Sequence, residues 1–364
     1  MNVFIRVDSS LEIGSGHLMR CLTLADLLRQ KGCVVSFICR ELPGNLCHIA
    51  EGKGFTVYRL PYKEAQRVEY TQQPLHAYWL GVDWELDAKE TIAVLAGAEG
   101  SVDWLIADHY ALDNRWESRV WPHAHRIMVI DDLADRHHEC NLLVDQNFYE
   151  SFGNRYDELV PNDCRKLLGP KYALLRREFA EARKGSRQRN GNIQHILIFF
   201  GGSDLTNETT KALEAVGLID RPDLGVDVII GVNNPNRYDI ESVANTMSQA
   251  TSHFHVDNMA ELMAAADLYI GAAGITTWER CCLGLPSMII TVAQNQVQAI
   301  KDMANHNLLC YVGENSMVDA CDIVDRLEYF LKNPLCLKQY SLNSMSLIDG
   351  LGSERCLNVL FDNE

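Results

Sequence analysis

The chain has 364 residues, 47% of them apolar and 23% charged, so it is long enough for two globular domains and has the composition of a folded protein. Its formal net charge of -16, from 33 basic and 49 acidic side chains, argues against broad binding to nucleic acids or anionic membranes, because both need a positive surface. A small anionic ligand is still compatible with this charge, since a few local backbone N–H groups can hold one.

The sequence begins with an apolar run and lacks the basic start, long apolar stretch and small-residue cleavage site of a secretion signal. No apolar run approaches the roughly 20 residues that span a bilayer. We therefore expect a cytoplasmic protein without stable membrane insertion, and we leave its oligomeric state open. The 12 cysteines form no CxxC pair and most lie in apolar runs, which favours buried reduced thiols over a disulfide framework.

In the first half, short β-branched runs alternate with segments of helical period, a pattern typical of parallel sheets with crossover helices. A helix is predicted over His17–Lys31, which carries its apolar residues on one face. We expect a doubly wound α/β domain over residues 1–165. Its predicted strands are Asn2–Val7, Cys33–Cys39, Thr56–Leu60, Asp103–Ala107, Arg126–Ile130 and Asn141–Val144.

The pattern weakens between about Gln146 and Asn192, which indicates a domain boundary, and a second alternating series follows. We expect a second α/β domain over residues 166–335 and a helical tail over 336–364. The predicted strands are His195–Phe200, Val226–Ile230, Leu268–Ile270, Ser287–Thr291 and Leu308–Val312, and the predicted helices are Thr206–Val216, Met259–Ala266, Thr276–Cys282 and Gln296–Ala304.

Three glycine turns stand where a predicted strand passes into a helix: Gly14–His17, Phe199–Asp204 and Ile270–Glu279. Glycine allows positive φ, and a helix start offers free N–H groups to an oxyanion. Tight packing could explain any one of these turns, but three together favour phosphate binding. No turn fits GxGxxG with a later acidic residue, and there is no GxxxxGK[ST], so redox and P-loop functions lose support.

The third turn and the next predicted strand carry further polar groups. Thr276 and Thr277 would place hydroxyls by a phosphate. Glu279 would offer a carboxylate to a ribose; the alternative is a solvated helix residue or one that interacts with the helix dipole. The end of the strand at Thr291 delivers Asn295 and Gln296, whose amides suit a sugar or a base. Capping of the following helix is the alternative role for Asn295.

These motifs resemble a known group of enzymes. The GSGH turn, GGSD, and GxxGxTTWExCxxGxP followed by QNQ are similar to the GT-B-fold nucleotide-sugar enzymes. Within that group, "FIRVDSSLEIGSGHLMRCLTLADLL", "IADHYALD" and "TTWERCCLGLPSMIITVAQNQ" look most like the PseG family, the UDP-2,4-diacetamido-2,4,6-trideoxy-β-L-altropyranose hydrolases of pseudaminic acid biosynthesis. The resemblance implies two Rossmann-like domains with parallel sheets facing across a cleft, and the nucleotide held mainly by the C-terminal domain.

The resemblance also implies cleavage of the sugar C1–oxygen bond by water, release of UDP, and no required metal or cofactor. His17 matches the family's catalytic histidine. The expected contacts with the UDP-sugar are Gly14, Gly16, Asp108, His109, Tyr110, Gly201, Gly202, Ser203, Gly274, Thr276, Thr277, Glu279, Asn295 and Gln296. The Asp108–Asp113 stretch could equally be a structural turn.

A histidine at position 17 also has a chemical rationale. Imidazole can accept a proton from water near pH 7, and the start of a helix disfavours its charged form. Asp8, at the end of the first strand, could orient the other ring nitrogen, or it could simply cap a turn. Direct attack by water would invert the anomeric centre, since no second carboxylate nucleophile is involved.

Two other functions fit the same motifs. The first is a glycosyltransferase, or a hydrolase of a different UDP-amino sugar, which would share the nucleotide loops and differ in the sugar pocket. The second is a nucleotide-sugar-binding module without catalysis. Histidine pairs such as His137-His138 lack the three or four ligands of a zinc site, so no metal site is predicted.

Overall fold

The computed structural model describes residues 1–63, 74–254 and 256–362. Its internal contacts divide the chain into two compact units: unit 1 comprises residues 1–147, 151–174 and 352–364, and unit 2 comprises residues 148–150 and 175–351. The limits differ from the expected 1–165, 166–335 and 336–364. One more strand after residue 164 extends the sheet of unit 1, and the last helix returns to that unit.

Unit 1 is built on a seven-stranded parallel sheet with the order β3-β2-β1-β4-β5-β6-β7. The six strands predicted for this half are present, with limits shifted by at most one residue. The seventh strand was not predicted, because its four residues include two basic ones and show no apolar run. The strands are β1 (Asn2–Val7), β2 (Val34–Arg40), β3 (Thr56–Leu60), β4 (Trp104–Asp108), β5 (Arg126–Ile130), β6 (Leu142–Asp145) and β7 (Arg165–Leu168).

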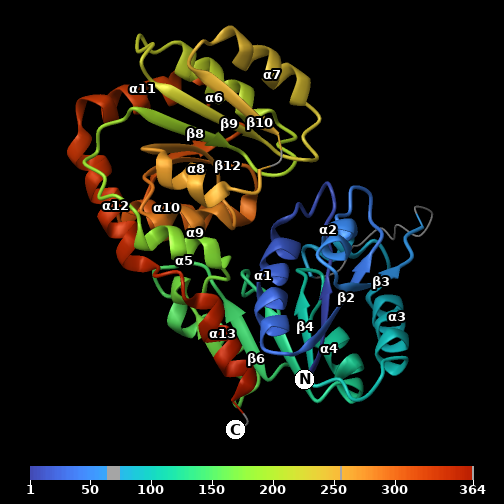
Figure 1. Cartoon of the computed structure of the whole chain (residues 1–364). Coiled ribbons are helices and arrows are strands. Elements are labelled where there is room, and N and C mark those ends of the chain that lie inside the picture. The colour runs from blue at the N-terminus through green and yellow to red at the C-terminus, as the bar shows by residue number, and fades with distance from the viewer. Residues whose placement is uncertain (64–73, 255, 363–364) are drawn as a thin grey trace. The chain divides into compact units, whose positions relative to one another are not determined.

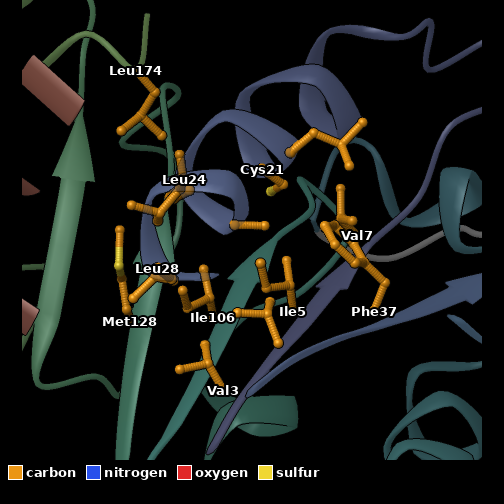
Figure 2. Packing of buried hydrophobic residues seen from close by; sticks show 14 of the residues in the cluster. Val3, Ile5, Val7, Cys21, Leu24, Leu28, Phe37, Ile106, Met128 and Leu174 are labelled. Atoms are coloured by element: carbon orange, nitrogen blue, oxygen red, sulfur yellow. The ribbon is translucent and has the colours of Figure 1, made fainter. Parts of the chain in front are cut away.

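Helices cover both faces of this sheet because successive strand residues point to opposite sides. Val3, Ile5 and Val7 join the core beneath one set of helices, whereas Phe4 belongs to the core on the other face. Figure 2 shows Leu24 and Leu28 of the first helix above Ile5 and Ile106 of the central strands. The first face carries α1 (Gly16–Gln30), α2 (Cys47–Gly52) and α13 (Gly352–Phe361), and the second carries α3 (Trp84–Ala96) and α4 (Asn114–Val120).

The C-terminal helix α13 is part of unit 1. Its Cys356, Leu357 and Leu360 are buried in the core of that unit, and Trp104 Nε1 donates a hydrogen bond of 3.2 Å to the carbonyl of Leu360. Short 3-10 turns complete the unit: η2 (Ala77–Leu80), η3 (Trp121–His123), η4 (Phe152–Asn154) and η5 (Pro170–Tyr172). Helix α13 thus shares a core with β1 and α1 at the start of the chain.

Unit 2 has a six-stranded parallel sheet with the order β10-β9-β8-β11-β12-β13. The five predicted strands are present, and the polar edge strand β10 was not predicted because its sequence, ATSHF, has no apolar run. The strands are β8 (His195–Phe199), β9 (Gly225–Ile230), β10 (Ala250–Phe254), β11 (Leu268–Ala272), β12 (Ser287–Thr291) and β13 (Cys310–Glu314).

The helices of unit 2 also lie around the sheet (Figure 1), and α6 and α11 share one core with the apolar residues of its central strands. The helices of unit 2 are α5 (Arg177–Lys184), α6 (Glu208–Gly217), α7 (Arg237–Thr246), α8 (Met259–Ala265), α9 (Thr276–Leu283), α10 (Val297–Asn305), α11 (Ala320–Lys332) and α12 (Pro334–Leu347), with the 3-10 turn η6 (Gln294–Gln296). Among the helices that the structure describes, none is long and apolar enough to cross a membrane.

In each sheet the first strand of the unit lies inside the sheet: the next two strands are added on one side of it and the later strands on the other. In unit 1 the two sides meet between β1 and β4, and in unit 2 between β8 and β11. The loops after such neighbouring strands diverge to opposite faces and leave a crevice beyond their carboxyl ends, where doubly wound proteins bind ligands. The glycine turns found in the sequence follow β1, β8 and β11, so all three stand at these two positions.

Candidate active site

His17 is the last residue of the GSGH turn and lies in the first turn of α1, and its imidazole contacts the end of strand β4. Its Nδ1 lies 2.5 Å from Oδ1 of Asp108, which is fully buried. Burial opposes ionisation of Asp108, but the charges of Arg20 and His17 hold the pKa of this carboxyl well below its usual value. A carboxylate can only accept, so Nδ1 carries the proton and Nε2 is left as the basic nitrogen.

Arg20 and Tyr110 complete a ring of contacts around this histidine. Arg20 donates to both oxygens of Asp108, from Nε at 2.6 Å and from Nη2 at 2.7 Å, and its Nη1 donates to Asp132 at 2.5 Å. Tyr110 donates its hydroxyl to the same Asp132 oxygen at 2.8 Å, and its ring meets the His17 ring edge to face at 4.5 Å. Hydrogen bonds and packing therefore fix the orientation of the imidazole from two sides.

The expectation that Asp8 orients His17 is not met, because Asp108 occupies that role. Asp8 is buried and accepts from Arg6 Nη1 at 2.6 Å and from the backbone N–H of Arg40 at 2.6 Å. Its Oδ2 also lies 3.3 Å from Nε2 of His109. Asp8 thus links the end of β1 to β2 and makes no contact with the imidazole of His17 among the described residues.

The residues expected to meet substrate from the Asp108–Tyr110 stretch contact protein groups instead. His109 is 4% exposed and its Nδ1 accepts the backbone N–H of Ala111 at 3.0 Å. Because Nδ1 accepts an N–H it carries no proton, and burial lowers the pKa of His109 although Asp8 opposes the shift. Tyr110 directs its hydroxyl to Asp132, and burial raises the pKa of that phenol. Of these two side chains, Tyr110 packs directly against the His17 ring.

Aromatic rings flank His17 on the side of turn η2. The Trp79 ring meets the imidazole edge to face at 6.3 Å and stacks on Tyr110 at 5.6 Å. His76 lies 4.5 Å from the Trp79 ring. Nε2 of His17 has no hydrogen-bond partner within residues 1–63, 74–254 and 256–362. A basic nitrogen beside aromatic walls suits proton transfer next to a ring-shaped, partly apolar substrate.

The glycines of the three turns combine positive φ with open space. Gly14, Gly201 and Gly274 have φ of +77°, +94° and +130°, and a Cβ added to any of them would meet nothing within 4 Å. Gly16 also has no atom within 4 Å of such a Cβ. Packing therefore does not account for these glycines; the positive φ explains Gly14, Gly201 and Gly274, whereas Gly16 leaves open space at the start of α1.

The second turn presents its N–H groups away from strand β9. A Cβ added to Gly231 would approach the carbonyl oxygens of Gly201 and Gly202 at 2.5 and 2.3 Å, so those carbonyls point toward β9. In trans peptides the N–H groups of Gly202 and Ser203 then point the opposite way. Within the part of the chain that the structure describes, neither N–H has a hydrogen-bond partner. Such a pair of amides can bind an oxyanion.

The start of α6 is already occupied by a carboxylate. Asp204 accepts from the backbone N–H groups of Glu208 at 2.9 Å and Thr209 at 3.0 Å, and from the Thr209 hydroxyl at 2.6 Å. A phosphate therefore cannot use these helix N–H groups, contrary to the simplest interpretation of GGSD. The free donors of this turn belong to Gly202 and Ser203.

The third turn is held by a buried arginine, Arg280. Its Nη1 donates to the Thr276 hydroxyl at 3.0 Å, its Nη2 donates to the Thr277 hydroxyl at 3.1 Å, and its guanidinium stacks 4.2 Å above the Tyr269 ring. The Tyr269 hydroxyl donates to the Phe199 carbonyl at 2.5 Å, which links this turn to the second one. The two turns of unit 2 thus form one continuous polar edge.

The remaining predicted residues lie around that edge. Glu279 is 5% exposed, and its Oε1 lies 3.3 Å from Arg176 Nη2. Burial raises the pKa of Glu279, with Arg176 opposing the shift. Gln296 donates to the carbonyl of Ala273 at 3.5 Å, while Asn295 is exposed and makes no side-chain cap for α10.

Sequence reasoning missed Arg20, Asp132 and Arg280. Arg20 stands three residues after His17, a spacing that places both side chains on one helix face, and Arg280 stands four residues after Thr276. Asp132 follows the end of β5. Helical spacing could have suggested both arginines, but their partners on other strands are visible only in the folded chain. In the described residues, no group of three or more His, Cys, Asp or Glu side chains could hold a metal ion.

Comparison with known proteins agrees with this architecture. Residues 195–346 match the model of the glycosyltransferase family 28 C-terminal domain. The chain is 26% identical over 81% of its length to the UDP-2,4-diacetamido-2,4,6-trideoxy-beta-L-altropyranose hydrolase of Campylobacter jejuni, of which 93% is covered. It is 22% identical over its whole length to the spore coat polysaccharide biosynthesis protein SpsG of Bacillus subtilis, of which 98% is covered.

An uncharacterised protein of Methanocaldococcus jannaschii is 26% identical over 82% of the chain, which spans 57% of that archaeal protein. Among solved structures, MurG of Acinetobacter baumannii superposes with a TM-score of 0.65 at 13% identity and 99% coverage of both chains. UDP-GlcNAc 2-epimerase of Neisseria meningitidis bound to UDP-GlcNAc gives a TM-score of 0.65 at 12% identity, with both chains fully covered. The protein therefore has the GT-B fold, and its second unit contains a region similar to the family 28 C-terminal domain.

Proposed function

We propose that this protein hydrolyses UDP-2,4-diacetamido-2,4,6-trideoxy-β-L-altropyranose to UDP and 2,4-diacetamido-2,4,6-trideoxy-L-altropyranose. The broader assignment, an enzyme that acts on a UDP-sugar, is supported by the relatives in Campylobacter and Bacillus and by the family 28 region. Hydrolysis is supported by one observation above all: Asp108 holds Nδ1 of His17 and leaves Nε2 as a base. The choice of sugar is supported by the similarity to the Campylobacter hydrolase.

In the proposed reaction, Nε2 of His17 accepts a proton from water while the water oxygen attacks C1 of the sugar. Asp108 stabilises the imidazolium that forms, as a carboxylate does for a catalytic histidine in other hydrolases. A positioned base of this kind contributes about 10²–10⁴-fold to a rate. The bond from C1 to the diphosphate oxygen breaks with inversion, and the diphosphate leaves with the bonding electrons.

Unit 2 would bind the leaving UDP. The free N–H groups of Gly202 and Ser203 and the hydroxyls of Thr276 and Thr277 would donate to its phosphate oxygens. Donors that are already oriented stabilise charge as it develops, without reorganisation during the reaction. Glu279 would accept from the ribose hydroxyls, and Asn295 and Gln296 would contact the sugar or phosphate. Because a diphosphate is a good leaving group, the proposal includes no separate general acid and no metal.

The decisive experiment is release of UDP from UDP-2,4-diacetamido-2,4,6-trideoxy-β-L-altropyranose by the purified protein, with EDTA present and no acceptor sugar. Proton NMR would follow the anomeric configuration of the first product formed. We expect rapid release of UDP and initial appearance of the inverted anomer. UDP-GlcNAc is the matched control substrate and should turn over much more slowly.

Two other outcomes would replace the proposal. Release of UDP only after addition of an acceptor would identify a glycosyltransferase. Tight binding of UDP without any turnover, at high enzyme concentration and with both substrates, would identify a binding module.

A further inference from the structure

Arg280 is a buried cation that no carboxylate contacts directly in the described part of the chain, although the charge of neighbouring Glu279 acts on it. Its side chain is 1% exposed and lies beneath the third glycine turn. Its partners are the hydroxyls of Thr276 and Thr277, the carbonyl of Ala272 at 3.3 Å and the face of the Tyr269 ring. Within the described residues no carboxylate forms an ion pair with it, and its Nε has no hydrogen-bond partner.

Other buried arginines of the described chain are compensated. Arg6, Arg20, Arg40 and Arg136 of unit 1 each contact two carboxylates. Arg189 of unit 2 donates to four backbone carbonyls, and these lie near the C-terminal ends of α8 and α9, where the helix dipole is negative.

Arg280 has the opposite position on α9. Its guanidinium contacts Thr276 and Thr277, the first two residues of that helix, where the dipole is positive. Burying an unpaired charge is costly, and placing it beside a positive helix end adds to the cost. Burial lowers the pKa of Arg280, and Tyr269, Cys281 and Glu279 oppose the shift only in part. An anion bound at the turn would remove this penalty.

The hydrogen bonds of Arg280 also determine what the threonines can do. A guanidinium is only a donor, so both hydroxyl oxygens accept from it and their hydrogens are directed elsewhere. In the described chain the backbone N–H groups of Ile275 and Thr276 have no partner, since the first N–H that closes the turn is that of Thr277, which donates to Gly274 at 2.9 Å. The turn therefore presents hydroxyl and amide donors beside open space at Gly274.

We propose that Arg280 is a positioning residue for a nucleoside diphosphate: it orients the hydroxyls of Thr276 and Thr277 as donors to the diphosphate and supplies the buried positive charge that the diphosphate neutralises. The inference rests on the proposed function, in which unit 2 binds UDP. It adds that recognition depends on the charge of the diphosphate and that the free protein is destabilised by the unpaired cation.

The test compares Arg280→Met and Arg280→Lys with the native protein. Calorimetry would measure the affinity for UDP, uridine and inorganic pyrophosphate, and thermal unfolding would be followed without ligand. For Arg280→Met we expect a loss of about 10–100-fold in UDP affinity, because hydrogen bonds to charged groups are the strong ones. Uridine affinity should stay unchanged, and the unfolding midpoint without ligand should stay the same or rise. Arg280→Lys should recover part of the lost affinity.

A double-mutant cycle shows whether Arg280 acts through the threonines. Thr277→Val alone should weaken UDP binding, and adding Arg280→Met should cost less than the sum of the two separate effects. Additive losses would overturn this part of the inference. Arg189→Met is the matched control, since it removes another buried arginine of unit 2; it should lower stability and leave the affinity for UDP unchanged.

The inference is overturned if Arg280→Met binds UDP as tightly as the native protein, or if it loses UDP and uridine affinity equally while its stability falls. These binding measurements need no turnover, so a failed hydrolysis assay leaves them informative. If the native protein fails to bind UDP, pyrophosphate takes its place as the probe. Failure of the native protein to bind either ligand would reject the inference.

Discussion

The carboxyl ends of the two sheets carry buried arginines in different electrostatic settings. In unit 1, Arg20 joins Asp108 to Asp132, so the charges around His17 are paired before any ligand arrives. In unit 2, Arg280 lies behind the third glycine turn without a carboxylate partner in the described chain. A paired network holds an imidazole in one orientation for proton transfer, whereas an unpaired cation favours binding of an anion. This difference is consistent with the proposed roles, in which unit 1 supplies the base and unit 2 binds the diphosphate.

Removal of the base should give the largest effect on activity. We expect His17→Asn to lower the rate of UDP release by about 10²–10⁴-fold, because the positioned base is lost. Its affinity for UDP should be unchanged, since the donors proposed for UDP belong to unit 2. Steady-state kinetics and calorimetry on the same preparation check both statements. Near-native turnover by this variant would remove His17 from the mechanism.

A second buried group of ion pairs in unit 1, around Arg6, should contribute strongly to the free energy of unfolding. Arg6→Met leaves the buried carboxylates of Asp8 and Asp87 without their main cation, and such a loss typically costs about 3–5 kcal/mol. Urea unfolding monitored by circular dichroism would measure it. Arg59→Met is the control, because Arg59 pairs with Glu41 and Glu51 on the surface, and it should cost less than about 1 kcal/mol. Equal losses would contradict the contrast between buried and exposed pairs.

Raising the pH to 9 should lower the free energy of unfolding of unit 1, by less than the loss expected for Arg6→Met. Burial would lower the pKa of His138, but the charge of Glu117 and the contact with Asp131 raise it to about 9 from 6.5. Stabilisation from this raised pKa is complete below pH 6.5 and is lost as the pH rises through 9, at a cost on the order of 3 kcal/mol. Burial and the charge of Asp132 raise the pKa of Asp145 to about 8. This shift also makes the folded protein less stable as the pH rises toward 8.

Urea unfolding at pH 6, 7.5 and 9 would measure this decline in the free energy of unfolding. The variant His138→Gln should be less stable at pH 6 and should lose stability less steeply toward pH 9. A free energy of unfolding that does not change across this range would show that His138 is not charged in the folded protein.

The smallest effect is expected at the proposed ribose contact. We propose that Glu279→Gln lowers UDP affinity by about tenfold, the equivalent of one hydrogen bond to a charged group, while leaving pyrophosphate affinity unchanged. Calorimetry with both ligands checks this. A loss of pyrophosphate affinity as well would mean that Glu279 acts by holding the helix start and Arg176 rather than the ribose.

Much of the fold was predictable from local pattern. The limits of Asn2–Val7, Thr56–Leu60, Arg126–Ile130 and Ser287–Thr291 match the predicted strands, because each is a short run rich in β-branched and aromatic residues. Strands without that signal, such as β7 and β10, were missed. The last helix was predicted as part of a tail, but its place in unit 1 depends on burial of Leu357 against strands that lie far away in the sequence.

The candidate site divides in the same way. The three glycine turns, the histidine that ends the first of them and the parallel sheets that bring these turns to the strand ends were predictable from local pattern, because backbone conformation and hydrophobic period are local properties. The folded structure was needed to show that Asp108 rather than Asp8 holds His17, that Tyr110 faces inward and that no carboxylate of the described residues pairs with Arg280. Those facts depend on which strands are neighbours, and neighbours in a sheet are set by packing across the whole unit.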